Sequence, residues 1–167
     1  MRFPQGRVTI PVAITAALLA ACGGSSNQTS PTPTPLTVAQ IQARYAAAAT
    51  HYNQGEVQIA VTENQSCDAT SATVALGACQ TALSAQRQLI IAYDNALRAI
   101  PLSGNAATDV THLIGDDAAI EKLLEQAATS PSISVIATLQ DQVIPLLATA
   151  AADAAALRAA IGLPAPA

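Results

Sequence analysis

The sequence contains very few aromatic residues and few charges. Its 167 residues include three tyrosines, one phenylalanine and no tryptophan, and charged side chains make up 11% of the chain. Binding of sugars, bases or flat cofactors by stacking needs aromatic rings, so the composition offers little for such ligands. Alternating β-branched and polar residues between tight turns are also lacking, which argues against a β-sheet fold. No Gly-x-Ser-x-Gly nucleophile motif occurs, and we expect neither an enzyme nor a cofactor.

The N-terminus has the pattern of a secretory signal. Arg2 and Arg7 precede an apolar stretch from Val8 to Leu19, and two alanines follow it. The stretch closes on Leu-Ala-Ala-Cys at positions 19–22, with Gly-Gly-Ser-Ser behind it. This ending resembles the lipobox of bacterial lipoproteins. The resemblance covers residues 1–22 alone; it implies that residues 1–21 are removed and that Cys22 carries the lipid.

Two other interpretations of this stretch are a membrane anchor that is not cleaved and a plain cleaved signal. Spanning a bilayer takes about 20 apolar residues, whereas Val8 to Ala21 supplies 14 uncharged residues that Pro11 interrupts. The lipobox interpretation predicts a protein of the cell envelope. It would be attached through Cys22 to an inner or outer membrane, or to the cell surface, on the non-cytoplasmic side.

The chain after residue 21 is acidic and long enough for one domain. It has 146 residues, with four arginines and one lysine against eleven acidic residues, a net charge of −6. Such a surface repels phosphate backbones and anionic head groups. We therefore expect no nucleic-acid partner, and the lipid must supply the membrane attachment.

A linker separates the lipid from the domain. Residues 23–35 read GGSSNQTSPTPTP, in which Gly and Ser favour flexibility and the Thr-Pro alternation favours extended polyproline II. We interpret residues 22–35 as the lipidated cysteine and its tether, with O-glycosylation of the Thr-Pro segment as an alternative role. Residues 36–163 form the domain and residues 164–167 a short tail.

Four segments of the domain have the apolar spacing of amphipathic helices. The first begins at Val38 with Thr37 as its N-cap and ends before a polar loop at 62–66; the second runs from about Ser71 to Ile100 and the third from about Ala106 to Thr129. Each segment has one stripe of residues that is expected to face the core. The stripe of the first segment is Val38, Ile41, Tyr45, Ala48, Tyr52, Gly55 and Ile59, and that of the second is Leu76, Cys79, Leu83, Gln86, Ile90, Tyr93, Leu97 and Ile100. The stripe of the third is Val110, Leu113, Ile120, Leu124 and Ala127, and that of the fourth is Ile133, Ile136, Val143, Leu147, Ala150, Ala154, Leu157 and Ile161.

The fourth segment has clear signals at both ends and one in its middle. Ser130 followed by Pro131 is typical of an N-cap and first helical residue, and Gly162 is typical of a helix end. Pro145 lies inside the segment, which predicts a kink or a break near residues 141–145. Four such segments with short connections predict an all-α, antiparallel up-and-down four-helix bundle, with its last helix kinked near Pro145. Alanine runs let the helices approach closely, so we expect no large internal cavity.

The lipobox interpretation also bears on the other two cysteines. Export places the domain where thiols are oxidised, and with Cys22 lipidated only Cys67 and Cys79 remain to pair. A structural disulfide is one interpretation and a redox-active pair is the other. The structural one is favoured, because the spacing is not Cys-x-x-Cys and Cys79 falls on a core-facing stripe.

Two groups of side chains are candidates for ligand binding. Tyr52, Gln86 and Tyr93 are expected to face one another and could line a small polar pocket; the alternative is that the tyrosines simply fill the core. Asp109, His112 and Asp116 lie at helical spacing on the third segment and are weak metal-ligand candidates. A di-iron bundle needs a second Glu-x-x-His motif, which the chain lacks, so a solvated acidic face is the simpler interpretation and no metal is expected.

The function that follows is a lipid-anchored, exported bacterial protein. Its helical domain would be a structural or protein-interaction module with an envelope protein as partner. The alternative is a small-molecule or metal-binding protein that uses the tyrosine seam or the His112 face.

Overall fold

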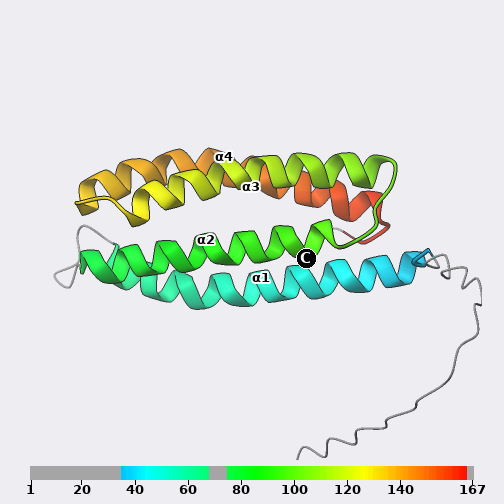
Figure 1. Cartoon of the computed structure of the whole chain (residues 1–167), viewed down its shortest axis with the longest axis horizontal. Coiled ribbons are helices and arrows are strands. Elements are labelled where there is room, and N and C mark those ends of the chain that lie inside the picture. Colours follow the sequence, from blue (N-terminus) through cyan, green and yellow to red (C-terminus); the bar gives the residue numbers. More distant parts are fainter. Residues whose placement is uncertain (1–34, 68–74, 165–167) are drawn as a thin grey trace, which may run out of the picture. The chain divides into compact units, whose positions relative to one another are not determined.

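The protein's computed structural model describes residues 35–67 and 75–164, and within them every regular element is a helix. The helices are α1 (Val38–Ser66), α2 (Leu76–Arg98), α3 (Asn105–Ala128) and α4 (Ile133–Ala160). Each consecutive pair lies side by side and runs in opposite directions (Figure 1). The predicted all-α, up-and-down four-helix bundle is therefore confirmed. Residues 1–34, with Cys22 and most of the expected tether, and 165–167 in the tail lie outside the described residues.

Helix α1 begins as predicted and ends later than predicted. Thr37 accepts a hydrogen bond from the backbone N–H of Gln40, whose side chain in turn accepts from the N–H of Thr37, so the two form a capping box. The expected loop at 62–66 is wrong, because these residues form the last turns of α1. Ser66 and Cys67 are both buried there, and the Cys67 N–H continues the helical pattern to the carbonyl of Glu63.

Helix α2 begins later than predicted. Ala75 is extended and α2 starts at Leu76 rather than at Ser71, so Cys79 lies in the first turn of the helix and not two turns into it. The helix ends at Arg98, before Pro101. In the following connection Gly104 has a φ of 57°, a left-handed conformation that glycine adopts without a steric penalty, and α3 begins at the next residue.

Helix α4 starts at Ser132–Ile133, and the prediction that Ser130 caps it is wrong. The Ser132 side chain accepts from the N–H of Val135, whereas the Ser130 hydroxyl donates backward to the carbonyl of Gln126 in α3. Ser130 thus completes the end of one helix instead of opening the next. Helix α4 is continuous through Pro145, so the predicted break is excluded; a kink there stays a prediction.

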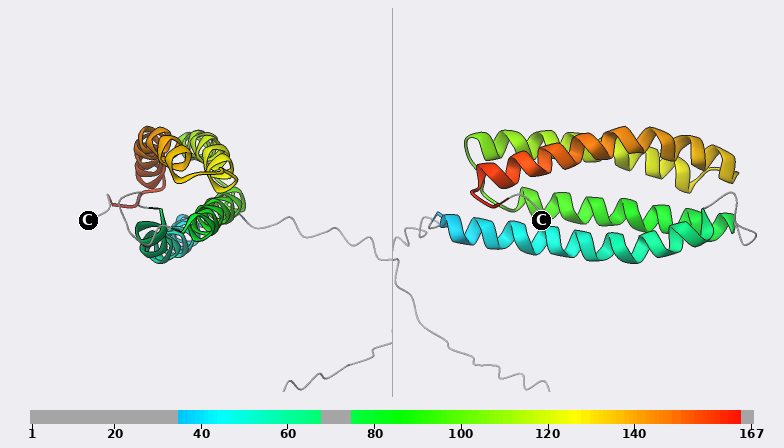
Figure 2. Two further views of the ribbon diagram at one scale, coloured as in Figure 1. Left: turned by 90° about the vertical axis from the view of Figure 1, so that its left-hand side faces the viewer. Right: turned by 180° about the vertical axis from the view of Figure 1, so that it is seen from behind.

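The core lies between the stripes expected from the sequence. Its largest fully buried apolar side chains come from α2, α3 and α4: Leu83, Ile90, Leu97, Ile120, Leu124, Ile136 and Leu157. Helix α1 contributes Tyr45 to this buried set and otherwise packs with half-buried residues. Viewed along the bundle axis, the four helices surround this shared interior (Figure 2).

Two residues expected to face the core do not. Val38 is 64% exposed and Leu147 is 39% exposed. Val38 is the first residue of α1 and has no helix opposite it that covers it fully. Leu147 lies on the side of α4 that faces α1, where α1 and α4 do not belong to the closely packed helix pairs. Leu147 lines a cleft on that side of the bundle.

Candidate functional site

A cleft lies between α1 and α4 in the middle of the bundle. Its volume is about 370 Å³, and all three tyrosines of the chain line it. The lining residues are Tyr45, Ala49, Tyr52 and Asn53 from α1, Tyr93 from α2, Leu113 and Asp117 from α3, and Leu147, Ala150, Ala151, Ala154, Ala155 and Arg158 from α4. Every helix therefore contributes to it.

The cleft exists because small residues of α4 stand opposite large residues of α1. Tyr45 and Tyr52 are seven residues apart, two turns on one face of α1. The facing wall of α4 is built from four alanines between Leu147 and Arg158. Alanine methyl groups do not fill the space beside the rings, so an open, largely apolar space remains. The expectation that alanines let the helices pack closely missed this lateral cleft.

Tyr52 and Tyr93 contact each other across the helices that carry them. Their ring centroids are 5.0 Å apart and their planes are inclined by 37°, an ordinary geometry for an aromatic pair. Burial, followed by the charge of Glu56, raises the pKa of Tyr52; burial, followed by the neighbouring Tyr45, raises the pKa of Tyr93. Both phenols therefore keep their protons and can donate hydrogen bonds at neutral pH.

Gln86, the third residue of the predicted pocket, is buried but is not among the residues that line the cleft. It belongs to a polar row beside it. Burial raises the pKa of Glu56, and hydrogen bonding to Tyr52 and Gln86 acts against that rise. Two turns further along α1, burial raises the pKa of Glu63 to about 7. The structure thus places two of the three predicted residues in one cleft.

One end of the cleft is closed by Arg158. Its guanidinium carbon lies 5.9 Å from the centre of the Tyr45 ring, which is within the range of a cation–π contact. The same guanidinium donates from Nε and Nη2 to the carbonyl oxygen of Pro164, at 3.2 and 2.8 Å. Beside it, the Gln42 side chain donates to the carbonyl of Ile161 at 2.8 Å and ties α1 to the end of α4.

Two buried carboxyl groups lie at the floor of the cleft. Asp117 of α3 lines it and is 7% exposed, and Asp94 of α2 lies behind it and is 1% exposed. Burial raises the pKa of both, and the charge of Asp94 raises that of Asp117 further. Arg98 donates to Asp94 Oδ2 at 3.3 Å and favours the ionised form of Asp94. We infer that Asp94 is the carboxylate and Asp117 the protonated partner, since adjacent buried carboxyls cannot both ionise cheaply.

A role for Asp94, Asp117 and Arg158 in this cleft was not predicted from the sequence, although a signal for Asp117 was present. The expected stripe of α3 passes from Leu113 to Ile120, a gap of seven residues. A helix returns to the same face after three or four residues, so position 117 had to face inward, and an aspartate there is an unusual core residue.

The metal candidates do not form a site. Asp109 and Asp116 are half-buried and His112 is exposed. Within residues 35–67 and 75–164, no three histidine, cysteine, aspartate or glutamate side chains are grouped so that they could hold a metal ion.

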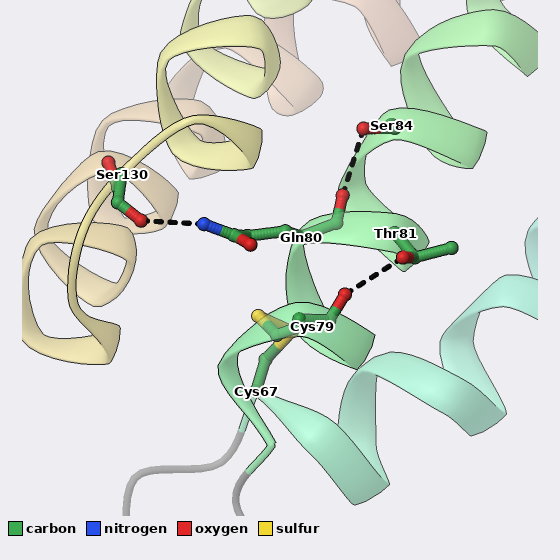
Figure 3. The surroundings of a disulfide bond; sticks show 7 residues. Cys67, Cys79, Gln80, Thr81, Ser84 and Ser130 are labelled. Carbon is green, nitrogen blue, oxygen red and sulfur yellow. Dashed lines mark hydrogen bonds between the residues drawn. A yellow bond between two sulfur atoms is a disulfide. The ribbon is translucent and has the colours of Figure 1, made fainter.

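Cys67 and Cys79 form a disulfide, as predicted. It joins the end of α1 to the first turn of α2, with the two Cα atoms 4.9 Å apart (Figure 3). Next to it, the Gln80 side chain donates to the carbonyl of Ser130 at 2.8 Å and ties α2 to the end of α3. Both sulfur-bearing residues are buried, which favours the structural role over the redox-active one.

Comparison with known proteins adds no relative to this description. No protein-family model, no curated protein and no solved structure matches the chain. Function is therefore inferred from the residues of the cleft.

Proposed function

We propose that this protein is a lipid-anchored binding protein of the bacterial cell envelope, and that a small molecule binds in the α1/α4 cleft. The observation that carries the proposal is the composition of the cleft: a mostly apolar wall with a few convergent polar groups, which is typical of small-molecule sites. Its volume of about 370 Å³ lies near the lower end of the range for such sites. The ligand is therefore a compact molecule.

The tyrosines make this proposal easy to test. The chain has no tryptophan and its three tyrosines all line the cleft, so intrinsic tyrosine fluorescence reports on this site alone. A compound that enters the cleft changes that signal in a saturable way. Screening compact amphipathic compounds by this signal should find binders with dissociation constants below about 1 mM.

A matched pair of variants locates the binding. Ala151→Phe fills the cleft, whereas Ala152→Phe places the same side chain at an exposed neighbouring position of α4 that does not line it. We expect Ala151→Phe to abolish the ligand-induced fluorescence change and Ala152→Phe to retain it. Equal binding by both variants would show that the ligand binds elsewhere.

The membrane attachment is supported by the sequence of residues 1–22. Cys22→Ala should remove lipid labelling and release the protein from the membrane fraction. Retention in the membrane with no label would contradict the lipoprotein assignment. The matched control is Ser25→Ala, which leaves the Leu-Ala-Ala-Cys motif intact and should be labelled normally.

A second candidate function is the protein-interaction module, and one observation supports it. Helix α4 is apolar and poorly covered: its most apolar 18-residue window has a mean hydropathy of 1.4, and 17% of that window is buried. Ile144 is 63% exposed on this helix. Crosslinking in intact cells tests the idea, since Ile144→Gln should weaken capture of an envelope protein if α4 is the contact surface. Unchanged capture would remove α4 from the interface.

A further inference from the structure

The floor of the cleft carries more negative than positive groups. Asp117 has Asp94 behind it on α2, and Asp116 and Glu121 beside it on α3; each of the three raises the pKa of Asp117 through its charge. Among these carboxyl groups, Asp94 is paired with a cation: Arg98 donates to its Oδ2 atom. On the side of Asp117 that faces the cleft, no arginine or lysine contacts its carboxyl group among the described residues.

The other two helices do not change this balance. From α1, the phenol of Tyr52 lies near Asp117 and is itself close to Glu56. From α4, the one cation of the cleft is Arg158, and the Pro164 carbonyl and the Tyr45 ring already hold it. Arg158 thus lies at one end of the cleft, and Asp117 at its floor has no counter-ion among the described residues, whereas Asp94 has Arg98.

Asp94 shows the same deficit in its hydrogen bonds. Its Oδ1 atom is buried, and no described residue supplies it with an ordinary hydrogen-bond donor. A buried acceptor without a donor costs free energy. A proton on Asp117 meets this need, because the resulting carboxylic acid can donate to Asp94. A cation that enters the cleft acts on Asp117 instead, since a positive charge beside that group favours its ionised form.

The walls of the cleft are suited to a cation as well. The rings of Tyr45, Tyr52 and Tyr93 line it, and aromatic faces attract ammonium and guanidinium groups. Arg158 over Tyr45 shows this contact within the cleft itself. The alanines of the opposite wall present methyl groups, which suit an aliphatic body.

We propose that the ligand of the cleft is a small organic cation, an alkylammonium ion whose charged head lies between Asp117 and the rings of Tyr52 and Tyr93. Its aliphatic body lies on the alanine wall of α4. This inference rests on the proposed function, because it names the chemical class of the molecule that occupies the same cleft.

Binding of the cation is coupled to release of a proton. The carboxylic acid of Asp117 loses its proton to the solvent, its carboxylate pairs with the ammonium group, and the charge of the site is conserved. An alkylammonium group stays protonated up to about pH 10, as lysine does. The affinity for the cation should therefore rise between pH 6 and pH 8, while that for a neutral ligand of the same shape should not.

The test uses three probes that share one body. Cyclohexylmethylamine is a cation at neutral pH, cyclohexylmethanol is neutral and cyclohexanecarboxylate is an anion. Each is titrated into the purified full chain and followed by tyrosine fluorescence. We expect the amine to bind at least about tenfold more tightly than the alcohol, a ratio that corresponds to ~1.4 kcal/mol, and the carboxylate to bind most weakly.

A substitution at the floor of the cleft tests the role of Asp117, and the same change elsewhere on α3 is the matched control. Asp117→Asn keeps the shape of the side chain and its ability to donate to Asp94, so the fold should be retained, as circular dichroism can verify. It should reduce the preference for the amine over the alcohol to about twofold or less. Asp109→Asn, the same change on α3 outside the cleft lining, should leave the preference intact.

The outcomes separate the two proposals. Comparable binding of the amine and the alcohol, or tighter binding of the carboxylate, would overturn the cation proposal and leave the cleft as a ligand site. No fluorescence response to any of the three probes at millimolar concentration would contradict both proposals.

Discussion

The two halves of this bundle are built on opposite principles. Helices α2 and α3 contribute large, fully buried aliphatic side chains such as Leu83, Leu97 and Leu124, and Asp94 and Asp117 are the buried acidic residues among them. Between α1 and α4, tyrosines stand opposite alanines, and the interior is a cleft with carboxyl groups at its floor. The first arrangement stabilises by removing apolar surface from water. The cleft between α1 and α4 buries less apolar surface, and it contains polar groups that do not contribute to hydrophobic packing.

The difference between the aliphatic core and the cleft indicates which residues stabilise the fold and which do not. Buried carboxyls are destabilising unless they are paired or protonated. Here Asp94 is paired with Arg98, and burial favours the protonated form of Asp117. The cleft is thus the part of the domain to which we assign the proposed binding.

The largest expected effect comes from a truncation in the core. Leu124→Ala removes a fully buried side chain, and we expect a loss of about 2–5 kcal/mol in the free energy of unfolding, measured by urea denaturation. Leu147→Ala, the same change on the wall of the cleft, should cost less than about 1 kcal/mol because the side chain is already partly exposed. Equal losses would mean that Leu147 is part of the core and that the cleft is closed in solution.

Removal of the disulfide has the next largest effect. The bond closes a loop of 12 residues, and the chain-entropy model assigns such a loop up to about 3 kcal/mol. The paired variant Cys67→Ser, Cys79→Ser should therefore unfold at a lower urea concentration.

The comparison of the two halves also predicts which helices lose stability when the disulfide is removed. Hydrogen exchange should show reduced protection first in the last turns of α1, with α2 and α3 retaining theirs. Uniform loss of protection across all four helices would contradict the view that the α2–α3 core holds independently.

The expected effect of pH on stability is smaller, and it comes from buried carboxyl groups. Burial raises the pKa of Glu63 to about 7 and also raises that of Asp117, so the folded state binds more protons than the unfolded state between about pH 4 and pH 7. Stability is therefore highest near the unfolded-state pKa of about 4 and falls as pH rises through the folded-state values.

Thermal unfolding at pH 5 and pH 8 tests this sign. We expect the melting temperature to be a few degrees higher at pH 5, and the variant Asp117→Asn to show a smaller difference between the two pH values. A higher melting temperature at pH 8 in the parent protein would show that these carboxyl groups are ionised and stabilised by partners.

The sequence was sufficient for the fold because helical periodicity is a repeated, local signal. Each stripe contains several residues, so an exposed member such as Val38 does not mislead the assignment. Helix ends were less predictable. The end of α1 is fixed by the disulfide of Cys67 to Cys79 in α2, which depends on tertiary structure that local propensity does not encode. Ser130 donates back to Gln126 of α3 instead of capping α4.

The cleft could be predicted in part. Tyr52 and Tyr93 were expected to face each other, and their ring centroids are 5.0 Å apart. The space beside them was not expected, because alanine is compatible both with close packing and with a gap. Which of the two occurs depends on the distance between α1 and α4, and no residue pattern within one helix specifies that distance.

The most direct test of the central claim is a set of NMR contacts between cyclohexylmethylamine and the protein. We predict nuclear Overhauser effects from the methylene next to nitrogen to the rings of Tyr52 and Tyr93, and from the cyclohexyl ring to the methyl groups of Ala151 and Ala155. Contacts confined to the exposed side chain of Ile144, with none to the tyrosine rings, would contradict the account.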